Sequence, residues 1–404
     1  MRDTDLFQLA LGLSSPWFVA RSDFSAEDKR LDIHLDFQRG ARFVCAGCGR
    51  DDCAVHDTRD DRWRHLDFFQ HQAVLHARVP RVTCPECGVR TVNVPWARPG
   101  SGFTLLFEAL ILAMVKDMPV LAVARLIGET DNKIWRILHH YVEEAVAAMD
   151  LSEVRQIAAD ETSAKRGHDY VSLFVDLARR RVIHVAEGKS AETVDEFAQE
   201  LEKHGGDAER ITDASIDMGA AFVAGVRRNF PHAALTFDKF HVIKLVNDAV
   251  DEVRRSESRK TALLKGTRYI WLKNTENLSE QQQARLAALE GANLDTAQAH
   301  QMRMNLQDIF KAPSVASAKR RLETWAAWVR ISELEPMIRA ATTLTEKADD
   351  ILRGIATKLS NGVMEAINGN VQAAKRKAKG YRSKRNLKAM IYLIAGDLPA
   401  LSPT

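Results

Sequence analysis

The chain has 404 residues, and its 57 Lys and Arg residues against 54 Asp and Glu residues give a formal net charge of +3. This near balance excludes a uniformly basic coat, but it does not exclude a local nucleic-acid-binding patch. The longest mostly apolar stretch, 105–115, is too short to span a bilayer, and residues 1–10 lack the layout of a signal peptide. We therefore expect a soluble cytoplasmic protein of two or three domains with no membrane partner.

All five cysteines lie in the first quarter of the chain, and four of them form two Cys-x-x-Cys-Gly motifs at 45–49 and 84–88. An odd number of cysteines without a secretion signal argues against a disulfide framework. Two residues between thiols allow a tight turn to point both sulfurs at one ion, and the following glycine permits a positive φ. The spacing predicts a closed structural Zn²⁺ site built from Cys45, Cys48, Cys84 and Cys87.

Two unrelated reduced pairs are the alternative interpretation of these cysteines. Cys53 has no partner motif and is interpreted as a free thiol, although it could replace a ligand. The histidines between the motifs could also ligate, or they could lie on the surface or face DNA from the intervening strands: His56, His65, His71 and His76. The segment 40–98 holds nine arginines, no lysine and seven acids. The arginines could contact phosphates and guanine edges, or they could belong to a solvated surface of mixed charge.

Prolines and glycines at 95–102 predict a linker, and three helices are expected after it. Helical spacing covers 103–116, Pro119 breaks it, a short helix covers 121–127, and a longer helix covers 131–147. A short helix, a turn containing Gly128 and a longer helix are typical of a helix-turn-helix, whose second helix enters the major groove. An ordinary three-helix unit is the alternative. The side chains expected to contact DNA are Thr130, Asn132, Lys133 and Arg136.

From residue 154 the pattern changes to strands, expected at 154–160, 170–176, 181–186, 210–216 and 233–237, with helices at 193–204, at 219–230 and from Asp238 onward. Three strands, helix, strand, helix, strand is the order of a ribonuclease-H-like fold. The stretch 252–273 has seven basic and two acidic residues, and helices are expected at 278–301 and 311–330, which suggests an all-helical insertion. One or two helices are expected at 360–394. The predicted division is 1–98, 99–150, 151–250, 251–355 and 356–404.

Two aspartates, Asp160 and Asp217, follow or end predicted strands and would converge if those strands are neighbours. Carboxylates suit hard cations such as Mg²⁺, and a pair of such ions serves phosphodiester displacement. Glu365 is the candidate third acid, because Glu365, Asn368, Gln372 and Arg376 recur on one polar helix face. A strand-end Asp is more often a turn or cap residue, and Asp176 and Asp213 compete for the second position.

Two further features lie near these acids in the predicted order. Asp238 and His241, three residues apart at a helix start, either support an active site or serve as a cap and a core-edge side chain, and Asp238 could itself ligate metal. The segment 371–388 has eight Lys and Arg residues and no acid, so it is the strongest candidate for phosphate contacts. The side chains expected to bind DNA there are Lys375, Arg376, Lys377, Lys379, Arg382, Lys384 and Arg385.

Together these motifs resemble bacterial insertion-sequence transposases of the ISL-three type, a branch of the DDE transposases, over nearly the whole chain. The resemblance rests on the doubled Cys motif, the helix-turn-helix, Asp160-Glu161, the segments 215–218 and 237–242, and 360–381 with its Glu365, Asn368, Lys375-Arg376 and Gly380-Tyr381. The family pattern has Gly after the final Glu and Phe after the late Gly, where this chain has Ala366 and Tyr381. Neither departure changes a carboxylate.

The resemblance implies a multidomain α+β fold, in which a zinc-binding module and a helix-turn-helix precede a ribonuclease-H-like α/β core interrupted by an all-helical insertion. It implies that Asp160, Asp217 and Glu365 bind catalytic Mg²⁺ or Mn²⁺, with Asp217 favoured over Asp238. The implied function is binding of terminal inverted repeats, DNA cleavage and strand transfer, by a homodimer in the synaptic complex, in the bacterial cytoplasm and at the nucleoid when DNA-bound. A non-catalytic zinc and helix-turn-helix regulator, and a metal-dependent endonuclease without strand transfer, are the alternatives.

Overall fold

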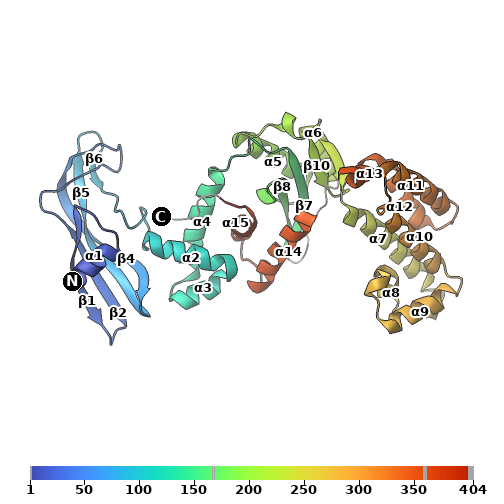
Figure 1. Ribbon diagram of the computed structural model, residues 1–404, viewed down its shortest axis with the longest axis horizontal. Coiled ribbons are helices and arrows are strands. Elements are labelled where there is room, and N and C mark those ends of the chain that lie inside the picture. The colour runs from blue at the N-terminus through green and yellow to red at the C-terminus, as the bar shows by residue number, and fades with distance from the viewer. Residues whose placement is uncertain (1, 166, 168, 358–361, 399–404) are drawn as a thin grey trace. The chain divides into compact units, whose positions relative to one another are not determined.

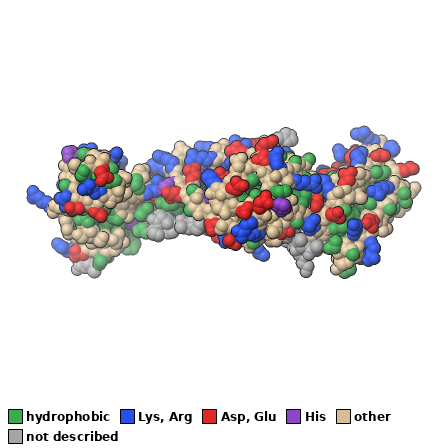
Figure 2. All heavy atoms as spheres, turned by 90° about the horizontal axis from the view of Figure 1, so that it is seen from above, with side chains coloured by type: hydrophobic (Ala, Val, Ile, Leu, Met, Phe, Trp, Pro, Cys, Tyr) green, Lys and Arg blue, Asp and Glu red, His purple; other side chains and the backbone are tan. Residues whose placement is uncertain are grey.

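The computed structural model describes residues 2–165, 167, 169–357 and 362–398, which form two compact units. The N-terminal unit is Met1–Ala145 and the C-terminal unit is Val146–Asp397. None of the described helices is long and apolar enough to cross a membrane. On the face shown in Figure 2, Lys and Arg side chains lie among Asp and Glu side chains, as the small net charge predicts.

The N-terminal unit begins with a six-stranded sheet in the order β1-β2-β5-β4-β3, with β6 paired to β5. Only β2 and β5 pair in parallel. Trp17, Trp63 and Trp96 are buried in its core, and the Trp17 and Trp96 rings meet edge to face with centroids 4.8 Å apart. The elements are α1(Asp3–Ala10), β1(Trp17–Ser25), β2(Arg30–Phe37), β3(Arg42–Phe43), β4(Cys53–Phe68), β5(His71–Cys84) and β6(Gly88–Thr91).

Three helices follow the sheet: α2(Leu105–Asp117), α3(Val120–Ile127) and α4(Asp131–Ala147). The predicted bounds of α4 are confirmed, and Gly128, at φ 72°, ends α3 in the left-handed conformation that glycine tolerates. The fully buried carboxylate of Glu108 accepts hydrogen bonds from Arg98 at 3.0 Å, Ser101 at 2.7 Å and Tyr141 at 2.6 Å. Because a buried charge is costly unless it is paired, this network ties the linker to α2 and α4.

The C-terminal unit contains a five-stranded sheet in the order β11-β10-β7-β8-β9. The strands β7, β8 and β9 are antiparallel neighbours, whereas β10 runs parallel to both β7 and β11. The predicted order of strands and helices is confirmed. The elements are β7(Gln156–Lys165), β8(Asp169–Asp176), β9(Arg181–Glu187), α5(Ala191–Lys203), η1(Ala208–Arg210), β10(Asp213–Ile216), α6(Ala220–Asn229), β11(Ala234–Phe237) and α7(Lys239–Glu257).

Helices cover both faces of this sheet (Figure 1). On one face the Phe174 ring of β8 stacks on Phe197 of α5, with centroids 4.4 Å apart. Successive strand residues point to opposite faces, so the preceding residue, Leu173, faces the other layer together with its cross-strand partner Asp160. That layer contains α14(Gly362–Lys377), which bonds to Asp160, and α15(Lys384–Ala395), whose Tyr392 hydroxyl accepts the Val185 amide at 3.1 Å.

Helices also fill the chain between α7 and α14: η2(Ala262–Leu264), α8(Arg268–Leu272), η3(Thr275–Asn277), α9(Glu280–Glu290), α10(Asp295–Ile309), α11(Val315–Arg330), α12(Glu335–Glu346) and α13(Ala348–Thr357). The stretch predicted to be helical at 278–301 is helical, but it is not continuous. It divides into α9 and α10 because the connecting turn includes Asn293 in the left-handed conformation, at φ 48°. Helix α13 packs against β11, where a Cβ on Gly354 would lie 3.2 Å from the Thr236 side chain.

Candidate functional site

Three aspartates lie at the same level across adjacent strands of the C-terminal sheet. Ser215 of β10 pairs with Ala158 of β7 and with Thr236 of β11. Each of these three residues lies two positions before an aspartate, namely Asp217, Asp160 and Asp238 in the same order. Neighbouring strands are about 4.8 Å apart, and residues at one level share a face. The register therefore places Asp217 between Asp160 and Asp238.

The position predicted for Asp160, at the end of its strand, is wrong. Strand β7 continues to Lys165 because the antiparallel strand β8 pairs with it along this length. On the β10 side, pairing stops at Ala158. Asp160 thus lies in mid-strand but beside the point where β10 ends, so it still lies at the level of Asp217 on the neighbouring strand.

Asp160 is partly buried and held on both oxygens. Its Oδ1 accepts the Glu161 amide at 2.8 Å, and its Oδ2 accepts the Asn368 side-chain amide at 2.7 Å. Burial raises the pKa of Asp160 and the charges of Asp217 and Asp238 raise it further, whereas the Glu161 amide and His241 oppose the rise. A site that gathers negative charge in this way is suited to a bound cation.

The other two aspartates accept backbone amides at helix starts. Asp217 Oδ1 accepts the Gly219 amide at 2.9 Å, and a Cβ at Gly219 would lie 2.9 Å from that oxygen. Asp238 caps α7 by accepting the Phe240 amide at 3.0 Å, so the capping interpretation is confirmed. His241 Nε2 lies 3.9 Å from Asp160 Oδ1 and 4.0 Å from Asp238 Oδ2.

The competing acids lie at the other end of β7. Asp176 is 2% exposed, pairs in register with Ile157 and lies 3.7 Å from Arg181. Asp213 bonds to Gln156 at 3.0 Å. Neither residue therefore reaches the level of Asp160.

Helix α14 is fastened along β7 by three polar contacts. Besides the bond from Asn368 to Asp160, Gln372 donates to the Thr162 hydroxyl at 2.6 Å, and Lys375 donates to the Ser163 carbonyl. Glu365 lies exposed one turn before Asn368 and lines the same groove as Asp238. The contacts of Gln372 and Lys375 were not foreseen, because their partners are more than 200 residues away in the chain.

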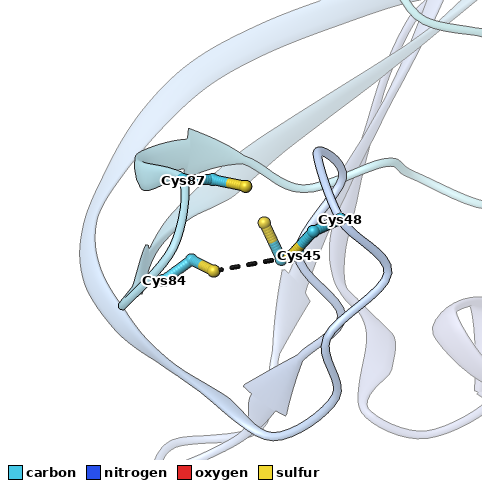
Figure 3. Close-up of side chains that lie close together, drawn as sticks. All are labelled: Cys45, Cys48, Cys84 and Cys87. Atoms are coloured by element: carbon cyan, nitrogen blue, oxygen red, sulfur yellow. Dashed lines mark hydrogen bonds between the residues drawn. The ribbon is translucent and has the colours of Figure 1, made fainter.

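The four predicted cysteines converge in the N-terminal unit. Among the described residues, they are the only group of three or more Cys, His, Asp or Glu side chains with ligand atoms within 4.8 Å of one another. Asp160, Asp217 and Glu365 therefore form no such compact group. The sulfurs come from two turns and point toward a common centre (Figure 3), with those of Cys48 and Cys84 3.6 Å apart. A zinc tetrahedron with bonds of about 2.3 Å has sulfur–sulfur edges of about 3.8 Å, so the cysteines fit Zn²⁺.

The backbone of the cysteine motifs favours a thiolate at Cys84 and turns at the two glycines. The amides of Cys87 and Glu86 lower the pKa of Cys84 to about 7. Gly49 and Gly88 have φ angles of 75° and 71°, as the motif predicted. Cys53 is buried outside the group, and its thiol donates to the Arg50 carbonyl at 3.6 Å.

The four histidines between the motifs do not join the cysteine group. His65 contacts the Thr104 hydroxyl at 2.9 Å, His76 contacts Asp32 at 2.5 Å, His71 packs edge to face on Phe24, and His56 is exposed.

The predicted DNA-contacting side chains have different environments. At the start of α4, Thr130, Asn132, Lys133 and Arg136 are exposed, and Lys133 also pairs with Glu129 at 2.7 Å. In the basic segment, Lys384 lies 2.8 Å from Asp169 and 3.3 Å from Glu187. Lys375 is half-buried. The remaining basic side chains predicted there are exposed: Arg376, Lys377, Lys379, Arg382 and Arg385.

Comparisons with known proteins connect these modules. The chain matches the zinc finger of transposase IS204/IS1001/IS1096/IS1165 over residues 41–91, the helix-turn-helix domain of transposase family ISL3 over 92–142, and the ISL3 DDE transposase domain over 157–391. It is 28% identical to the transposase for insertion sequence element IS1001 of Bordetella parapertussis, over 84% of this chain and 86% of the relative. It is 27% identical to the transposase for insertion sequence element IS1557 of Mycobacterium tuberculosis, over 99% and 98% of the two chains.

The match to the transposase domain spans more than half of the chain, and the two N-terminal matches coincide with the cysteine group and with the helices α2 to α4. These findings confirm the predicted zinc-binding module, which the match assigns to a zinc finger of this transposase group, and the predicted helix-turn-helix, and they support structural zinc and DNA binding. The chain belongs to the ISL3 family of insertion-sequence transposases and is an enzyme with transposase activity.

Proposed function

We propose that this transposase binds the terminal inverted repeats of its insertion sequence, cleaves DNA beside them and joins the freed ends to target DNA. The observation that carries the proposal is the alignment of Asp160 with Asp217 across neighbouring strands, beside the helix that bears Glu365. A sheet of three antiparallel strands, with two parallel strands added beside β7, supports a ribonuclease-H-like core. The helices between α7 and α14 are proposed to be an insertion into that core. Synapsis of two ends favours a homodimer.

Asp160, Asp217 and Glu365 are the residues proposed to hold divalent cations, with Asp238 and His241 in support. All three primary groups offer oxygen, the donor that Mg²⁺ and Mn²⁺ prefer. Beside them, Asn368 Oδ1 is buried without a hydrogen-bond partner among the described residues. Such an acceptor suits a water molecule of a partly hydrated ion. Divalent cations held by these residues would supply activation of the attacking oxygen and stabilisation of the leaving oxygen.

The chain's own residues position the substrate. Exposed side chains at the start of α4 are proposed to read the major groove of the repeat, and the zinc ribbon is proposed to bind the same end. The exposed basic side chains after Glu365 are proposed to contact phosphates near the acids. Asn368 bonds to the Asp160 carboxylate, and His241 is proposed to orient Asp160 and Asp238, whose oxygens lie 3.9 and 4.0 Å from its Nε2.

The test is an in vitro reaction with end-containing DNA, Mg²⁺ and a target plasmid. Joined products are the result expected of the transposase. Cutting without joining would support the endonuclease, and binding without either reaction would support the non-catalytic regulator.

Replacing Asn368 with Ala is expected to raise the Mg²⁺ concentration needed for half-maximal cleavage about tenfold or more, because loss of an outer-shell partner typically weakens metal sites 10–100-fold. Saturating metal should restore much of the rate, which a purely structural defect would not allow. The measurement is a metal titration of the cleavage rate. Asn370→Ala, an exposed site on the same helix, is the control. An unchanged metal dependence in Asn368→Ala would contradict its positioning role.

Charge reversal at Lys377 and Lys379 is expected to weaken DNA binding and to flatten its salt dependence. Each lost phosphate contact lowers the slope of log affinity against log salt by about 0.9. The measurement is binding of end-containing duplex at several salt concentrations, with Lys319→Glu on the exposed surface of α11 as the matched control. If the double variant keeps the wild-type slope, the DNA path lies elsewhere.

A further inference from the structure

A groove of about 1120 Å³ begins at Asp238 and Glu365 and extends to α10 and the loop after α8. Small-molecule sites are typically about 300–1,000 Å³, so a groove of this size has room for a ligand of a few nucleotides. One end of the groove is the candidate active site. Its remaining lining comes from the start of α7 and from helices that sequence reasoning had assigned only to an insertion.

The groove contains a buried positive charge. Arg303 on α10 is 2% exposed, yet among the described residues its guanidinium bonds only to uncharged acceptors: the side-chain oxygens of Asn247 and Asn274, the Leu272 carbonyl and the Met304 sulfur. Burial lowers the pKa of Arg303, and Glu276 at longer range opposes that shift. A buried charge without a direct counter-ion is costly, so this position favours an anionic ligand.

The rim adds further positive charge. Apart from Asp238 and Glu365 at the active-site end, the lining includes three basic side chains besides Arg303, namely Lys239, Lys273 and Lys311, against two acidic ones, Glu276 and Asp308. Asp308 is already paired with Lys311 at 3.1 Å. The net charge of this part of the lining suits phosphates.

Phe240 and Phe310 are two of the three phenylalanines that line the same groove. Phe240 is 58% exposed although it follows the Asp238 cap by only two residues. The Phe310 ring lies 5.3 Å from Lys239 Nζ, a cation–π arrangement that holds the lysine over the groove. An exposed ring between basic side chains is the combination that binds single strands, because every base has a face that can stack.

We propose that this groove binds a short unpaired stretch of the DNA strand adjoining the scissile phosphate. The phosphates lie toward Arg303 and the rim lysines, and a base stacks on Phe240. The inference rests on the proposed function, because it assigns this groove to the DNA strand that extends away from the proposed catalytic acids. It gives the helices between α7 and α14 a direct part in holding DNA.

The test uses the full-length zinc-loaded chain in buffer without Mg²⁺ or Mn²⁺, so that nothing is cut. Two probes are compared by fluorescence anisotropy: a blunt duplex ending at the terminal repeat, and the same duplex with a five-thymidine tail on either strand. The tail is expected to tighten binding about tenfold, because stacking contributes about 1–3 kcal/mol per base. Phe240→Ala should lose most of that gain, and Lys273→Ala with Lys311→Ala should lose part of it.

Matched controls lie outside the groove. Tyr269→Ala removes a similarly exposed ring, at 63% exposure, and Lys319→Ala removes an exposed lysine, and both should keep the full gain from the tail. Equal affinity of the wild type for both probes, or a gain that survives Phe240→Ala and the lysine double variant, would overturn the inference. If the protein cleaves and joins DNA in Mg²⁺ but binds the tailed and blunt probes equally well, only the proposed role of the groove is refuted. A tail effect without cleavage would refute the proposed function and leave the groove as a single-strand site.

Discussion

Asp160→Asn is expected to abolish DNA cleavage and leave binding of the terminal repeat intact. The substitution keeps the shape of the side chain and an oxygen that can accept the Glu161 amide, but it removes the charge that a divalent cation requires. Cleavage should fall at least a thousandfold, which corresponds to about 4 kcal/mol of barrier. The measurement is single-turnover cleavage of end-containing DNA, with binding measured on the same preparation.

Asp213→Asn is the matched control, because Asp213 lies on the same sheet at the opposite end of β10. It should cleave at the wild-type rate. The pair Asp217→Asn and Asp238→Asn separates the two candidates for the second acid: the register predicts a complete loss at Asp217 and a smaller effect at the helix cap. Cleavage that survives in Asp160→Asn would refute the proposed triad.

Cys84→Ser is expected to remove zinc from the protein and to weaken end binding at least tenfold. Serine does not offer a thiolate, and Cys84 is the ligand whose pKa the neighbouring amides lower to about 7. Structural zinc contributes about 10–16 kcal/mol of apparent binding free energy to small zinc domains, so its loss should unfold the turns that carry the ligands. Elemental analysis and the melting temperature of the variant are the measurements.

Cys53→Ser is the control for this experiment, since Cys53 is buried nearby but lies outside the four-cysteine group. It should retain one zinc per chain. If Cys84→Ser keeps the wild-type zinc content, the four-cysteine site is wrong, and if Cys53→Ser loses zinc, Cys53 is a ligand.

Sequence patterns were sufficient to predict the features that are formed by residues close together in the chain. Two Cys-x-x-Cys-Gly motifs specify a turn and two sulfurs each, so the zinc group was predicted from spacing, and its glycines have the expected φ angles. Helix α4 was predicted to the residue because its apolar spacing is regular and Gly128 precedes it. The split between α9 and α10 was missed because the turn is formed by Asn293 rather than by a proline.

What the sequence alone determined about this transposase is its set of parts: a zinc-binding module, a helix-turn-helix, an ordered series of strands and helices, and three candidate acids. The tertiary structure decided which distant residues meet. Asp160 bonds to Asn368 across 208 residues of chain, and Asp217 reaches Asp160 only through the register of β10 on β7. The groove around Arg303 had no sequence signal at all. Periodicity and spacing report contacts within one turn or strand, whereas register and buried charge depend on packing between elements that are far apart in the chain.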